Sequence, residues 1–213
     1  MALPDHRTPE PESPDTSSEI VCVRIDASAA SSFTVHLHLL CATSKVFRDD
    51  LQPGTGQASP RTIDLFHEDE AVFKVYVSWL YSLEVPFPAM DGETVDYARS
   101  WELFTKAYLL GDHVLDMTFK NAIVDAIAGM MQSVNPNAAS RLAPVPGRMA
   151  ITALYSGTTQ GSKGRLLFAE LCTDRLSIRA FRASRKHYPF DFILDFAEAL
   201  MSRHAGRDGQ EYC

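Results

Sequence analysis

The chain has 213 residues, of which 46% are hydrophobic, and its formal net charge at neutral pH is −7. This length and composition are enough for one domain with an extension, or for two small domains, built around a hydrophobic core. Because binding to nucleic acid or to an anionic membrane needs a basic surface, the acidic balance argues against both kinds of partner.

The four cysteines of the chain are widely separated and form no Cys-x-x-Cys pair. This spacing is typical of a protein from a reducing compartment rather than of a disulfide framework. The N-terminus lacks a signal-peptide pattern, and no apolar run reaches the roughly 18 residues of a membrane span. We therefore expect a cytoplasmic or nuclear protein that does not associate with a membrane.

Residues 1–18 contain four prolines and four acidic residues but almost no apolar side chains. Burial of so few apolar groups cannot offset the entropy lost on ordering the chain. The composition therefore predicts a disordered tail, rich in proline and acidic residues, without a helix.

A strand that runs directly into a helix is predicted around residues 33–47. Apolar and polar residues alternate over residues 33–38, which is the pattern of a half-buried strand. From residue 39 the spacing becomes helical, and Leu40, Ser44 and Phe47 fall on one stripe of a single helix. On this reading Ser44 is an internal packing residue of that helix.

The same segment contains a candidate metal site, formed by His36, His38 and Cys41. Two imidazoles at positions i and i+2 of a strand face the same way, and a nearby thiolate is a suitable third ligand. No fourth ligand is evident, so the interpretation that we favour is a structural one, in which His36 caps or hydrogen-bonds the backbone where the strand meets the helix. A small metal-dependent or hydrolytic enzyme using His36 or His38 stays open as an alternative.

Further elements follow in the order strand, helix, helix, helix. The patterns predict a strand over residues 62–65 and helices over residues 71–81, 101–112 and 117–127.

Particular residues are expected to mark the ends of these helices. The acidic residues 68–70 suit the N-terminus of the helix over 71–81, and Pro86 and Pro88 are expected to end it. Gly111 is expected to be the C-cap of the helix over 101–112.

The pattern Phe-x-x-His-x-x-x-Leu-x-x-x-Ser-x-x-Phe, together with the Trp-Leu-Tyr ending of the helix over 71–81, resembles the BTB/POZ domain, a protein-interaction module. The resemblance covers residues 19–133. It implies an α+β fold in which a short mixed sheet is flanked by a cluster of helices. The residues that carry the fold signature are Phe33, His36, Leu40, Ser44, Phe47, Trp79 and Tyr81.

The rest of the chain is predicted to be a helical extension. Residues 134–148 contain two clusters of helix breakers and are expected to form a linker. Residues 149–205 hold three helical patterns, which we expect to pack on the end of the preceding domain, and residues 206–213 are expected to be a flexible tail. The arrangement is similar to that of fungal proteins with a single BTB domain.

The resemblance implies a protein–protein interaction module of the scaffold or adaptor type. The sequence contains no Gly-x-Ser-x-Gly, His-Glu-x-x-His or Gly-x-Gly-x-x-Gly motif, so we expect a non-catalytic protein without a cofactor. Partners implied by the family are other BTB-containing proteins, co-regulators or cullins. The chief alternative is therefore a substrate adaptor of a cullin-based ubiquitin ligase.

Two departures from the family bear on the partner. Adaptors usually carry a hydrophobic-x-Glu element soon after the position of Phe47, whereas residues 48–56 contain no glutamate. Leu37 stands where the co-repressor-binding subgroup has a basic residue. The lack of a helical pattern in residues 1–18 also argues against the helix-exchanged homodimer of the family.

The partner-binding residues that we propose from the sequence fall into two groups. Residues 1–162 carry 11 Lys and Arg against 20 Asp and Glu, whereas residues 163–213 carry 9 against 7. The basic excess is either a solvated connector before the last helix or a docking site for an acidic partner or for the acidic tail. The candidate residues are Phe47, Leu51, Arg179, Arg182, Arg185 and Lys186.

Overall fold

The computed structural model describes residues 19–26, 31–51, 61–86, 96–133 and 145–208. The N-terminal part contains β1 (Ile20–Arg24), β2 (Ser32–His36), α1 (Leu37–Thr43), α2 (Lys45–Asp50), β3 (Arg61–Asp64) and α3 (Glu70–Ser82). It is followed by α4 (Tyr97–His113), α5 (Met117–Ser133), α6 (Arg148–Gly157), α7 (Lys163–Arg175), α8 (Ile178–Ser184), the 3₁₀ turn η1 (Arg185–His187) and α9 (Phe190–Asp208).

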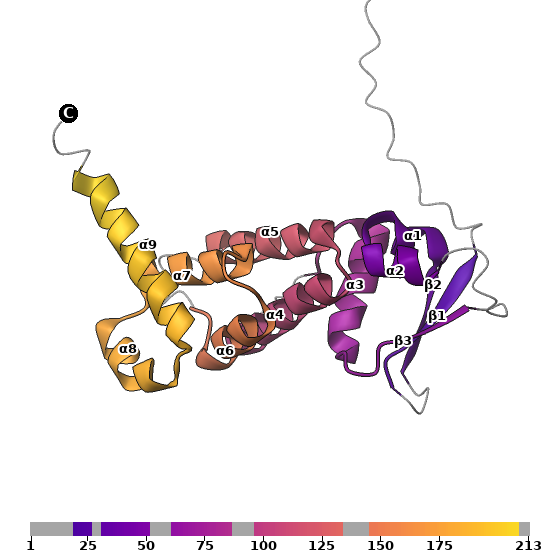
Figure 1. Cartoon of the computed structure of the whole chain (residues 1–213), viewed down its shortest axis with the longest axis horizontal. Coiled ribbons are helices and arrows are strands. Elements are labelled where there is room, and N and C mark those ends of the chain that lie inside the picture. The colour runs from indigo at the N-terminus through magenta and orange to yellow at the C-terminus, as the bar shows by residue number, and fades with distance from the viewer. Residues whose placement is uncertain (1–18, 27–30, 52–60, 87–95, 134–144, 209–213) are drawn as a thin grey trace, which may run out of the picture.

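The molecule is elongated, with the sheet at one end and α8 and α9 at the other (Figure 1). The long helices α4 and α5 run between the two ends. The described residues therefore form an α+β fold that is mostly helical, as predicted.

The sheet has three strands in the order β2-β1-β3 and is mixed. β1 pairs antiparallel with β2, with Val21 opposite Val35, and parallel with β3, with Val23 opposite Ile63. The side chains of Val21, Val23 and Val35 are fully buried. Phe33 on β2 contacts Phe73 of α3 with ring centroids 5.1 Å apart, so α3 covers the apolar face of the sheet.

The junction between strand and helix differs from the prediction in two ways. The strand ends at His36 and α1 begins at Leu37, two residues earlier than expected. The single helix predicted through Phe47 is also wrong, because Ser44 has an extended backbone (φ −83°, ψ 126°) that separates α1 from α2.

Ser44 is the N-cap of α2 rather than an internal helix residue. Its hydroxyl accepts a hydrogen bond from the backbone N–H of Phe47 at 3.2 Å and donates one to the carbonyl of Val114 at 2.6 Å. Serine favours this geometry because its side chain offers the backbone an alternative to the helical hydrogen bond.

α3 begins as predicted from the sequence, but it does not end in the predicted way. Asp69 is the N-cap, since its carboxylate accepts a hydrogen bond from the Ala71 N–H at 2.9 Å. The helix ends at Ser82 because Leu83 adopts a left-handed conformation (φ 57°) and donates its N–H to the Trp79 carbonyl. Pro86 lies beyond this cap and so does not end the helix. The other expected breaker, Pro88, lies outside the described residues.

Gly111 lies inside α4 and is not the predicted C-cap. The helix continues to His113, with Val114 as its cap. A Cβ atom on Gly111 would lie 2.7 Å from the side chain of Lys120 and 3.2 Å from that of Phe119. Glycine is therefore needed at this position because α5 crosses α4 too closely for any side chain.

The C-terminal helices pack on the preceding ones, as expected. α6 packs against α4, α7 contacts α5, and α9 lies along α7 (Figure 1). The segment predicted as a connector before the last helix instead contains α8 and η1.

The ends of the predicted segments are partly outside the described residues. Three predicted segments lie wholly or partly outside the described residues: the tail at 1–18, residues 134–144 of the linker, and residues 209–213 of the C-terminal tail. The last helix, α9, continues to Asp208, past the end predicted at residue 205. In the described part of the chain, no helix combines the length and apolar character needed to span a membrane.

Candidate interaction surface at the C-terminal end

Two residues of the signature meet at the end of the sheet. The Nδ1 atom of His36 lies 2.5 Å from the hydroxyl of Tyr81, which also accepts the His36 backbone N–H at 3.3 Å. His36 occupies the N-cap position of α1, but its side chain makes no capping hydrogen bond. The imidazole thus links β2 to α3.

The candidate metal site required His36 and His38 to lie on one strand, and this prediction is wrong. His36 ends β2, whereas His38 lies in α1, and their ring centroids are 6.0 Å apart. The Cys41 thiol points at the carbonyl of Phe47 at 3.6 Å, and burial raises its pKa above the usual value. Among the described residues, no three His, Cys, Asp or Glu side chains form a group that could hold a metal ion.

The prediction that Phe47 and Leu51 contact a partner is wrong. Phe47 is fully buried and Leu51 is 3% exposed, because both side chains point into the core. The Phe47 ring packs against Tyr76 with centroids 6.3 Å apart. These residues stabilise the fold and present no surface to another protein.

A buried carboxylate that the sequence reading missed joins three helices. Asp116 accepts hydrogen bonds from the hydroxyls of Thr43 at 2.5 Å and Tyr76 at 3.0 Å, and from the Phe119 N–H at 2.9 Å. Burial, together with the nearby Asp116, raises the pKa of Tyr76. The signal in the sequence was an Asp directly before an apolar helix, which is the pattern of an N-cap.

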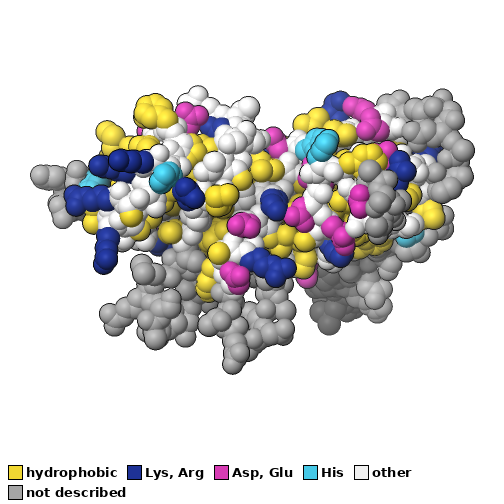
Figure 2. All heavy atoms as spheres, turned by 90° about the horizontal axis from the view of Figure 1, so that it is seen from below, with side chains coloured by type: hydrophobic (Ala, Val, Ile, Leu, Met, Phe, Trp, Pro, Cys, Tyr) yellow, Lys and Arg dark blue, Asp and Glu magenta, His cyan; other side chains and the backbone are white. Residues whose placement is uncertain are grey.

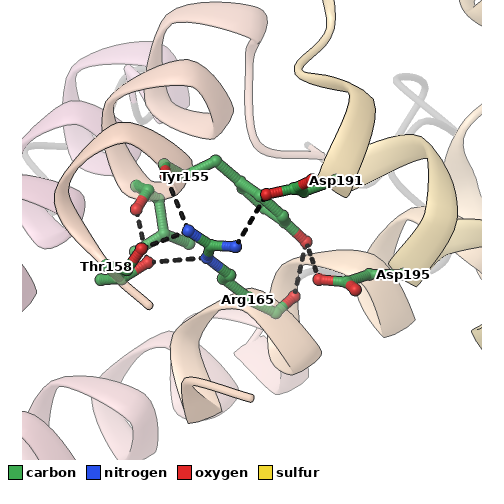
Figure 3. Close-up of polar contacts among 6 residues, drawn as sticks. Tyr155, Thr158, Arg165, Asp191 and Asp195 are labelled. Atoms are coloured by element: carbon green, nitrogen blue, oxygen red, sulfur yellow. Dashed lines mark hydrogen bonds and ion pairs between the residues drawn. The ribbon is translucent and has the colours of Figure 1, made fainter. Parts of the chain in front are cut away.

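The C-terminal helices are held together by a buried arginine that the sequence also did not reveal. Arg165 of α7 is 4% exposed and donates to the carbonyls of Tyr155, at 2.7 Å, and Thr158, and to the Thr158 hydroxyl at 3.0 Å (Figure 3). The Thr158 hydroxyl in turn donates to the Leu154 carbonyl at 2.6 Å. Together these bonds satisfy carbonyls at the C-terminus of α6 that have no partner within the helix.

The same arginine connects α7 to α9. Its guanidinium lies 3.4 Å from the carboxylate of Asp191 and stacks over the ring of Tyr155 at 4.6 Å. The Tyr155 hydroxyl donates to Asp195 at 2.8 Å, so Asp191 and Asp195 of α9 are both engaged (Figure 3). Burial and the nearby Asp195 raise the pKa of Tyr155.

An aromatic cluster anchors α8 to α9. The Phe181 ring lies 5.6 Å from the ring of Phe196 and 6.2 Å from that of Tyr188. Tyr188 continues the cluster to the fully buried Phe192 at 5.0 Å. These contacts turn one side of α8 inward, which leaves the charged residues of the segment on the outside.

We refer to the exposed basic residues of this segment as the α8 cationic surface. Lys and Arg side chains gather at this end of the molecule (Figure 2). Among the described residues, none of the side chains of this surface has a hydrogen bond or ion pair. The surface consists of Arg179, Arg182, Arg185, Lys186 and His187, all of them exposed.

Two large apolar side chains flank this surface. Ile178 at the start of α8 is 64% exposed, and Phe190 at the start of α9 is 72% exposed. The structure therefore brings together four of the six residues predicted to bind a partner and separates them from the other two, which are buried.

No family model matches the chain, and no curated protein is significantly similar to it.

Proposed function

We propose that this chain is a non-catalytic protein-interaction protein in which residues 19–133 form a domain of the BTB/POZ type. Support for the domain type comes from the element order and the mixed sheet, which agree with the resemblance seen in the sequence. The contact between the signature residues His36 and Tyr81 gives the pattern a structural role that does not depend on a metal or a reaction.

The observation that carries the interaction role is the α8 cationic surface. Four cationic side chains, Arg179, Arg182, Arg185 and Lys186, lie within eight consecutive residues and repel one another, and none is neutralised by a described residue. Phe181 anchors α8 through aromatic contacts that do not involve these charges. Exposed arginines beside large apolar side chains are typical of protein interfaces.

A capture experiment with full-length protein tests this role. Wild-type protein and the variant Arg182→Glu/Arg185→Glu are immobilised, and the proteins retained from an extract of the source organism are quantified by mass spectrometry. The matched control is Arg99→Glu/Lys163→Glu, which makes the same change in net charge at exposed sites on α4 and α7.

We expect at least one protein to be retained by the wild type and the control but lost with the α8 variant, and to bind again when purified. Titration calorimetry with the purified partner measures that affinity. Equal capture by all three proteins, or no rebinding, would contradict the proposed role of α8. Recovery of a cullin would identify the adaptor alternative, whereas stoichiometric metal or turnover in a hydrolase screen would favour an enzyme.

A further inference from the structure

A groove of about 580 Å³ lies between α7 and α9, and no described function uses it. Its floor is apolar and consists largely of side chains from α7. Leu166, Leu167, Leu171 and Ala199 line it, and Leu166 is 50% exposed. Apolar side chains left open to water in a concave surface favour the binding of another apolar group.

The rim of this α7–α9 groove is acidic. Two of its carboxylates are already engaged, since Asp174 pairs with Arg203 and Asp195 accepts the Tyr155 hydroxyl. The other two, Glu170 on α7 and Glu198 on α9, are exposed and make no hydrogen bond or ion pair with the described residues. The groove therefore presents unpaired negative charge beside an apolar floor.

The α8 cationic surface has the complementary chemistry. Ile178 supplies an exposed apolar side chain, and Arg182 and Arg185 follow it on the same short segment. Within one chain, these arginines form no ion pair with the carboxylates of the groove. One chain thus carries two complementary surfaces, the α8 cationic surface and the α7–α9 groove, which make no ion pair with each other within that chain.

We propose that α8 of a second copy of this chain docks in the α7–α9 groove. Ile178 lies on the leucine floor, and Arg182 and Arg185 pair with Glu170 and Glu198 on the rim. Each copy carries both surfaces, so a two-fold arrangement makes the contact twice. The inference rests on the proposed role of α8 as a protein-binding surface and names one partner for it.

The size of the two surfaces predicts a weak association. A groove of this volume and a helix of seven residues make an interface near the low end of the range for specific complexes. We expect a dissociation constant on the order of 10 μM at low salt. Because the pairing charges are exposed, the association weakens as the salt concentration rises.

Sedimentation equilibrium of the purified full-length chain tests the proposal. In 50 mM NaCl we expect the average mass of wild-type protein to rise from that of one chain near 1 μM towards that of two chains near 200 μM. The same series in 500 mM NaCl is expected to show a markedly smaller rise. Circular dichroism of each protein confirms that it is folded.

Charge exchange then locates the interface. Arg182→Glu/Arg185→Glu and Glu170→Arg/Glu198→Arg are each expected to abolish the association, whereas an equimolar mixture of the two variants restores it. The controls are Arg99→Glu/Lys163→Glu and Glu102→Arg/Asp125→Arg, which reverse the same number of exposed charges elsewhere and are expected to associate like the wild type. If a reversal prevents folding, the corresponding glutamine variants replace it.

Two results would overturn the inference. A wild-type protein that stays monomeric at 200 μM in 50 mM NaCl excludes the second copy as the partner. Association that survives both reversals, or that the mixture of variants fails to restore, excludes the α7–α9 groove as the site. Neither result decides the proposed function, which the capture of a different protein by the α8 surface tests separately.

Discussion

Replacement of Arg165 by methionine gives the sharpest test of how the C-terminal helices are held. Methionine keeps the unbranched side chain but removes every hydrogen-bond donor. The buried contact to the Tyr155 carbonyl and the part-buried contact to the Thr158 carbonyl are then lost, and the exposed carboxylate of Asp191 loses its cation.

The expected cost follows from the burial of this site. Loss of the hydrogen bonds to the carbonyls at the end of α6 costs about 1–3 kcal/mol, because a buried acceptor is left without a partner. The ion pair with Asp191 adds little to this figure, because the Asp191 side chain is 66% exposed and is hydrated without its partner. Arg165→Lys keeps the charge but lacks the planar fork, so it is expected to recover only part of the loss.

Urea denaturation followed by far-ultraviolet circular dichroism measures the free energy of unfolding. The matched control is Arg203→Met, which removes an arginine that also pairs with an aspartate but whose side chain is 43% exposed. We expect the control to cost less than about 1 kcal/mol. If Arg165→Met proves as stable as Arg203→Met, the argument from buried carbonyls is wrong.

Three further predictions concern the rest of the molecule. Ser44→Ala is expected to lower the free energy of unfolding by about 2 kcal/mol, because it removes the N-cap of α2 and the hydrogen bond to Val114. Urea denaturation measures this loss. A cost below about 0.5 kcal/mol would contradict the capping role. The hydrogen bond from Lys106 lowers the pKa of Asp69 below 3.8, so this group stabilises the fold above that pH and the contribution is lost as the pH falls through the lowered value. The stability difference between wild type and Asp69→Asn should therefore be present at pH 6, be less than about 1 kcal/mol for this exposed pair, and shrink in thermal melts as the pH falls below 3.8. A difference independent of pH would exclude the charge. Burial raises the pKa of Cys172 to about 12, so at pH 8 iodoacetamide should leave this thiol unlabelled in peptide mass spectrometry until the protein unfolds, and rapid labelling of native protein would show that α7 opens readily.

Residues whose role depends on near neighbours were predictable from the sequence. The apolar spacing over residues 71–81 located α3, and the acidic residues before it marked the N-cap at Asp69. The order of strands and helices also follows from local periodicity, because each element must turn its apolar side towards a core, whereas the mixed sheet was expected only from the family resemblance.

Residues whose role depends on distant segments were not predictable in this way. Phe47 follows a helical pattern, but only its packing against Tyr76 of α3 shows that it is buried rather than available to a partner, and the burial of Leu51 likewise appears only in the folded chain. The same holds for the basic residues before α9, which lie in α8 and η1, where Phe181 packs against the rings of Tyr188 and Phe196.

Two single residues illustrate the difference between what the sequence determines and what only the tertiary structure decides. The sequence alone placed Gly111 at the end of a helix over 101–112 and Arg165 in the helical extension over 149–205, since both predictions depend on adjacent residues. Only the tertiary structure decided that Gly111 allows α5 to cross α4 and that Arg165 binds the end of α6. The physical reason is that periodicity specifies which side of an element is apolar, whereas the identity of the group opposite depends on how separate elements pack.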